Sequence, residues 1–91
     1  MNLLDAIKTH GNQYNGAEVT QADLAAIKAA PAKKFKSQKG NDYFSTTMFW
    51  QEDGKTYSMR LLCQAEGQTL QEGMLVSVSE YETGKWSARV E

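Results

Sequence analysis

Lysines and aromatic residues are interleaved in the middle of the chain, a combination that can bind single-stranded nucleic acid. The segment KKFKSQKGNDYF, residues 33–44, carries four lysines and three aromatic rings. Ammonium groups can lie along phosphates, and flat rings can stack under bases at ~1–3 kcal/mol per base with little regard to sequence. The plainer interpretation is a solvated lysine loop beside aromatic residues of the core.

Basic charge is concentrated around this segment. Residues 24–64 contain seven basic and three acidic residues, whereas the rest of the chain contains three basic and eight acidic ones. The formal net charge of −1 excludes a uniformly basic protein of the histone type, but it leaves room for a local basic surface.

A β-hairpin can be drawn in register around Asp53-Gly54, because Asp-Gly is a strong signal for a two-residue type I′ turn. Residues 46–52 then pair in order with residues 55–61. Side chains alternate between two faces of such a hairpin. The expected core face carries Phe44, Met48, Trp50, Tyr57, Met59, Leu61 and Cys63. The other face carries Tyr43, Ser45, Thr47, Phe49, Ser58 and Arg60. Exposed rings beside an arginine suggest that something covers this second face.

The chain lacks the residues that most catalytic and metal sites need. Its one cysteine, Cys63, continues the expected core face, and one histidine, His10, removes Ser-His-Asp catalysis and most Cys/His metal sites. No acidic pair converges on an expected cleft. We therefore expect no enzyme activity, no metal and no cofactor.

Ninety-one residues, 41% of them apolar and 23% charged, are expected to form one small globular domain. No apolar stretch approaches the ~20 residues of a membrane span. Polar residues interrupt residues 1–16 too early for a signal peptide. We expect a cytoplasmic protein with no membrane association, and the limited core of so short a chain favours self-association.

Two regions of different periodicity follow one another. Residues 1–32 are expected to form an N-terminal extension that is mainly helical, with Gly11 stopping the first helix and a turn-rich loop at residues 12–16. Residues 33–91 are expected to form short strands separated by glycine-containing turns. This second pattern is typical of a small antiparallel barrel or sandwich.

The end of the extension has two interpretations. Thr20 can cap a second helix, with Asp23 at its third position in the capping-box pattern and Pro31 ending the helix. The alternation in residues 22–30 can instead supply the first strand of the barrel.

Five short motifs follow one another with characteristic spacing. They are SQKGNDY at 37–43, EDGKTY at 52–57, AEGQ at 65–68, GMLVSV at 73–78 and TGKW at 83–86. In their order and spacing, these motifs resemble the helix-destabilising, single-stranded-DNA-binding proteins of filamentous bacteriophages. The matching elements of that family are an S-x-x-G-x-x-Y hairpin, an acidic-Gly turn before Tyr, a D-E-G-Q loop, a G-x-Y-x-V strand and Val-Gly-Gln-Phe. A broader resemblance, to oligonucleotide/oligosaccharide-binding (OB) barrels, covers the same region.

This resemblance implies a small five-stranded antiparallel OB-like barrel, a symmetric dimer and cooperative, sequence-tolerant coating of phage single strands during replication in the host cytoplasm. It places Tyr43 at a base-stacking tyrosine and Trp86 at the aromatic tip of another hairpin. The family's hairpin arginine falls at Gln38, so neighbouring lysines are expected to replace it. With two residues from the hairpin face, the candidate nucleic-acid-binding residues are Lys34, Lys36, Lys39, Tyr43, Phe49, Arg60, Trp86 and Arg89.

Other interpretations stay open. Trp86 can instead fold back onto Tyr81 as a cross-strand pair. The barrel can be a phage-encoded protein-interaction module without nucleic-acid binding, which suits the acidic remainder of the chain. The expected partner is single-stranded DNA, and the sequence does not distinguish it from RNA.

Overall fold

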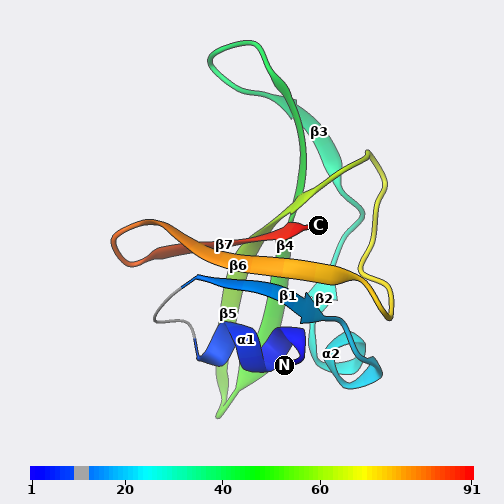
Figure 1. The fold of residues 1–91 in the computed structure, drawn as a ribbon, viewed down its shortest axis with the longest axis vertical. Coiled ribbons are helices and arrows are strands. Elements are labelled where there is room, and N and C mark those ends of the chain that lie inside the picture. The colour runs from blue at the N-terminus through cyan, green and yellow to red at the C-terminus, as the bar shows by residue number, and fades with distance from the viewer. Residues whose placement is uncertain (10–12) are drawn as a thin grey trace.

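A mostly β architecture with two short N-terminal helices is found in the computed structural model, which describes residues 1–9 and 13–91. In this part of the chain, seven strands form one sheet (Figure 1). The helices are α1 (Leu3–Lys8) and α2 (Gln21–Ala26). The strands are β1 (Tyr14–Glu18), β2 (Lys28–Ala29), β3 (Lys33–Lys36), β4 (Asp42–Glu52), β5 (Lys55–Cys63), β6 (Leu75–Glu82) and β7 (Lys85–Val90). No helix among the described residues is long and apolar enough to cross a membrane.

The sheet corrects the expected five-stranded antiparallel barrel. Its strand order is β1-β6-β7-β5-β4-β2. The strand β3 also pairs with β4, at residues 42–45, whereas β2 pairs with β4 at residues 48 and 49. The pair β5–β7 is parallel, and the others are antiparallel. Among the described residues, β1 and β2 stand at opposite ends of this order and do not pair, so the sheet is not closed. Two of its strands come from the first 32 residues, where the sequence patterning favoured a loop at residues 12–16 and a helix at residues 20–30.

The predicted hairpin is confirmed residue by residue. Glu52 faces Lys55, and the pairing continues without a bulge to Phe44 opposite Cys63. The turn residues Asp53 and Gly54 have φ values of 52° and 77°, the left-handed conformations that a type I′ turn requires. The sequence therefore specifies both the register and the two faces of this long ribbon.

The core lies on one side of the sheet and beneath α1. The apolar hairpin residues that were expected inside include Met48, Trp50 and Leu61, which are buried. Tyr57 was also expected in the core, but it is exposed and stacks on Trp50 with ring centroids 5.9 Å apart. It belongs to the third residue pair from the hairpin turn, near the end of the β4–β5 hairpin, where few side chains remain to cover a ring.

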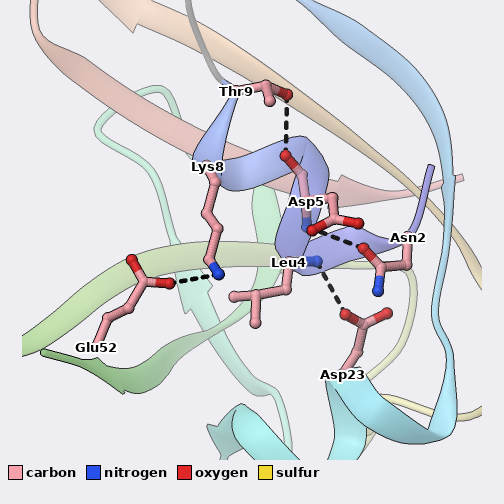
Figure 2. Close-up of polar contacts among 7 residues, drawn as sticks. All are labelled: Asn2, Leu4, Asp5, Lys8, Thr9, Asp23 and Glu52. Atoms are coloured by element: carbon pink, nitrogen blue, oxygen red, sulfur yellow. Dashed lines mark hydrogen bonds and ion pairs between the residues drawn. The ribbon is translucent and has the colours of Figure 1, made fainter.

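A buried carboxylate joins the two helices. Asp23 is fully buried and forms the predicted capping box with Thr20. Its two carboxylate oxygens also accept hydrogen bonds from the backbone N–H groups of Leu3 (3.1 Å) and Leu4 (2.9 Å) at the start of α1. Figure 2 shows the bond from Leu4. One side chain therefore satisfies donors of both helix starts, which fixes α1 against α2.

Two further contacts hold α1 in place, as Figure 2 shows. The Asn2 side chain accepts a hydrogen bond from the Asp5 backbone N–H and caps the helix. The Lys8 ammonium lies 2.6 Å from the Glu52 carboxylate on β4. Their hydrogen bond raises the pKa of Lys8 above its ordinary value.

The elements of the extension differ from expectation at their ends. The first helix ends at Lys8, and its expected stop, Gly11, lies outside the described residues, as do His10 and Asn12. The expected loop is wrong, since Tyr14–Glu18 is a strand paired with β6. The second helix ends at Ala26 rather than Pro31, because the next residues turn into β2. The helical interpretation of residues 22–30 therefore holds as far as Ala26, and the two-residue strand that follows lies at one end of the strand order and is not the first strand of a barrel.

Candidate nucleic-acid interface

The face of the sheet opposite the core collects aromatic, basic and hydroxyl side chains. Cross-strand partners share a face, so the register shows which residues lie together. Phe35 on β3 faces Tyr43 on β4, and Arg60 on β5 faces both Thr47 on β4 and Ser87 on β7. Six strands, β2 to β7, therefore contribute to one surface, which we call the open face. Its register residues are Lys28, Lys33, Phe35, Tyr43, Ser45, Thr47, Phe49, Ser58, Arg60, Leu62, Ser77, Ser79, Ser87 and Arg89.

A groove of about 790 Å³ lies on the open face. Among the described residues, no carboxylate lines it, whereas two arginines, three aromatic rings and three serines do. The lining residues are Gln13, Asn15, Phe35, Tyr43, Arg60, Leu62, Ser77, Ser79, Tyr81, Ser87 and Arg89. This composition suits an anionic ligand that also presents flat rings.

A stacked ring pair and an arginine form the most organised part of the groove. Phe35 and Tyr43 stack with centroids 5.5 Å apart and planes 25° apart. The Arg60 guanidinium carbon lies 5.7 Å from the centre of the Phe35 ring, within cation–π range. Because Tyr43 is 38% exposed, its ring remains accessible while the guanidinium is held beside the pair.

The two groove arginines have no acidic partner in the described ranges, residues 1–9 and 13–91. The ion pairs found there join Lys8 to Glu52, Lys34 to Asp42, and Lys85 to Glu82. Arg60 and Arg89 therefore keep their charge available to a ligand. One carboxylate borders the β6 side of the open face, since Glu91 accepts a hydrogen bond from Ser77 Oγ at 2.5 Å.

A second hollow of about 370 Å³ adjoins the first on the same face. Arg60 lines both hollows. The second also contains Phe49, which is 47% exposed, together with Lys33 and the hydroxyl residues of β4. Of the eight candidate residues from the sequence, the open face thus brings together Tyr43, Phe49, Arg60 and Arg89.

Two of the predicted lysines lie on the other side of the ribbon. Lys34 faces Phe44, and Lys36 faces Asp42, so both alternate away from Phe35 and Tyr43. Lys34 also lies 3.6 Å from the Asp42 carboxylate. Of the three lysines on β3, Lys33 therefore lies on the same side as the rings, and Lys34 and Lys36 do not.

Lys39 and Trp86 also lie apart from the groove. Lys39 is exposed in the turn between β3 and β4, which projects from the end of the molecule opposite the helices (Figure 1). Trp86 is half-buried, packs against the core cluster and faces Glu80 across the β6–β7 hairpin. Tyr81, which the sequence offered as a cross-strand partner of Trp86, is 60% exposed and lines the groove.

Several groove residues were missed at the sequence level. The serines of β6 and β7 alternate with buried residues, as in Val76-Ser77-Val78, so their exposure was predictable. Their position in the groove was not, because it depends on the parallel pairing of β5 with β7. Asn15 was missed because its segment was taken for a loop.

Cys63 lies half-buried, and burial raises the pKa of its thiol, which keeps it protonated near neutral pH. Within the described part of the chain, no group of three His, Cys, Asp or Glu residues is arranged to hold a metal ion.

Comparisons with known proteins do not extend these findings: no protein-family model, curated protein or solved structure matches the chain.

Proposed function

We propose that the protein binds single-stranded DNA along the open face, without base specificity. The observation that carries this proposal is the groove itself, which a stacked aromatic pair and two arginines line; among residues 1–9 and 13–91, these arginines have no acidic partner and the groove has no carboxylate.

The aromatic residues support a ligand that contains bases. Tyr43 and Tyr81 line the groove and are 38% and 60% exposed, which costs hydrophobic exposure in the free protein. A base stacked on such a ring recovers ~1–3 kcal/mol. Base pairs in a duplex are already stacked on each other, so an unpaired strand gains most from these rings.

The charges support a ligand with a phosphate backbone. Arg60, Arg89 and Lys33 lie on the open face, and the first two line the groove. The net charge of −1 comes from an acidic excess outside residues 24–64, so the basic residues of the open face can still attract an anion locally. The serine hydroxyls add hydrogen-bond donors that favour no particular base.

The arrangement of strands is compatible with this function. Partly open barrels of the OB type bind oligonucleotides across the face of two adjacent strands. Here the long β4–β5 hairpin supplies Tyr43, Phe49 and Arg60 to such a face. On this basis we propose an OB-like fold that is enlarged by the strands β1 and β2. We also propose that the protein forms a homodimer.

The test is binding of fluorescein-labelled dT10, followed by anisotropy between 20 and 200 mM NaCl. Tryptophan emission is a poor reporter, because Trp50 and Trp86 lie on the core side. Each phosphate neutralised on a single strand contributes about −0.7 to the slope of log affinity against log salt. The double variant Arg60→Gln/Arg89→Gln should therefore weaken binding and make the slope shallower by about 1.4.

A matched control separates local contacts from net charge. Lys8→Gln/Lys55→Gln removes the same amount of charge from the hairpin end near α1, away from the groove. It should leave the slope unchanged. Failure of the wild type to bind dT10 at 20 mM NaCl, or equal loss in both double variants, would contradict the proposal, and the same titration with U10 compares DNA with RNA.

A further inference from the structure

The open face holds a second aromatic position, and we infer that a bound single strand stacks both at the Phe35/Tyr43 pair and at Phe49, with Arg60 contacting the phosphates between them. This inference rests on the proposed function. It adds a second stacking site, and with it a minimum ligand length.

Phe49 is placed to receive a base. Its side chain is 47% exposed and lines the hollow of about 370 Å³ next to the main groove. Lys28 on β2 is its cross-strand partner, so a cation lies beside the ring on the same face. A ring flanked by an ammonium group repeats, on a smaller scale, the combination found at Phe35 and Arg60.

Arg60 links the two positions. It lines both hollows, and it faces Thr47, which lies between the two rings on β4. Its guanidinium is held over Phe35, so the charge is positioned before any ligand arrives. Lys33, opposite Ser45, adds a second cation along the same stretch.

Charge along this path is of one sign. Among the described residues, neither hollow has a carboxylate in its lining. The cations along the path are Lys28, Lys33, Arg60 and Arg89, on four different strands. A single strand of DNA lying along β4, from Tyr43 to Phe49, therefore has cations from β2 and β3 on one side and from β5 and β7 on the other, which a peptide of mixed charge would not exploit.

The spacing of the two positions sets the ligand length. Tyr43 and Phe49 are six residues apart on β4, which corresponds to about 20 Å at ~3.3 Å per residue. A stacked single strand rises ~3.4 Å per nucleotide, so about six nucleotides span this distance. A trimer can occupy one position, whereas a decamer can occupy both.

The experiment measures the affinity of the wild type, Phe49→Ala, Tyr43→Ala and Tyr57→Ala for labelled dT3, dT6 and dT10 at 20 mM NaCl. Tyr57 serves as the control, because it is a 41% exposed ring on the opposite face. Far-UV circular dichroism verifies that each variant is folded. For dT10, Phe49→Ala should lose about five-fold or more in affinity, while Tyr57→Ala changes it by less than two-fold.

The dependence on length distinguishes the outcomes. The loss in Phe49→Ala should be smaller on dT3 than on dT10, because a trimer occupies one position, whereas the loss in Tyr43→Ala should persist on dT3. If Phe49→Ala matches the wild type on dT10 while Tyr43→Ala is impaired, the second position is refuted and the proposed function stands. If the wild type binds no oligomer, the proposed function fails and the inference fails with it.

Discussion

Replacing the buried carboxylate of Asp23 should cost more stability than any ordinary helix cap. Asp23→Ala removes the acceptor of three backbone N–H groups, those of Leu3 (3.1 Å), Leu4 (2.9 Å) and Thr20 (2.8 Å). A buried donor left without a partner costs ~1–3 kcal/mol. The bond from Leu3 is buried and those from Leu4 and Thr20 are partly buried, so we take the lower end of that range, which gives a loss of about 3 kcal/mol for the three. A domain of this size has ~5–15 kcal/mol in total.

The assay is urea unfolding at equilibrium, followed by circular dichroism, with Asn2→Ala as the matched variant. Asn2 caps α1 by accepting one exposed hydrogen bond from the Asp5 backbone N–H at 3.0 Å. The loss of this cap should therefore cost only ~1 kcal/mol. Asp23→Asn should lie between the two, because an amide keeps one acceptor oxygen and turns an NH₂ group toward the remaining donors.

The result that would refute this reasoning is an Asp23→Ala variant within ~1 kcal/mol of the wild type, with an unchanged urea dependence. In that case α1 would not depend on the carboxylate for its attachment. A loss equal to that of Asn2→Ala would show that Asp23 acts as a simple cap of α2, without a role at the start of α1.

Three further predictions test the hairpin turn, the core and the environment of Cys63. Gly54→Ala places a side chain at φ 77° in the hairpin turn and should lower the free energy of unfolding by ~1 kcal/mol in the same urea assay; no loss would argue against the type I′ turn. Met48→Ala removes a fully buried side chain and should cost ~2–5 kcal/mol, whereas Leu75→Ala, at a 48% exposed position, should cost ~0.5 kcal/mol or less; equal losses would contradict the assigned core. Alkylation of Cys63 by iodoacetamide, followed by mass spectrometry across pH 7–10.5, should show its inflection above that of a free thiol, because burial raises the thiol pKa; an inflection below it would contradict this environment.

Local rules predicted what depends on neighbours in sequence. The Asp53-Gly54 turn fixed the hairpin register, and with it the separation of Met48 and Leu61 from Tyr43 and Arg60. The Thr20 capping box was predicted in the same way. These features follow from one turn or one cap, and no distant contact competes with them.

Features that depend on distant pairing were not predictable. Tyr14–Glu18 contains Asn and Gly, which favour a loop locally, yet pairing with β6 makes it a strand. The lysines of residues 33–39 were assigned to the binding site from composition. Only the register of β3 with β4 shows that Lys34 and Lys36 point away from the rings. Likewise, only the parallel β5–β7 pair places Arg89 beside Leu62, within reach of Arg60.

The proposed binding face can be mapped directly by ¹⁵N-edited NMR of the labelled protein, titrated with unlabelled dT10. The account predicts that backbone amide shifts concentrate on the open face, at Tyr43, Phe49, Arg60, Ser87 and their neighbours, with little change in α1 and α2. Shifts concentrated on the helices and the Tyr57 side, or a spectrum that dT10 leaves unchanged at low salt, would contradict it.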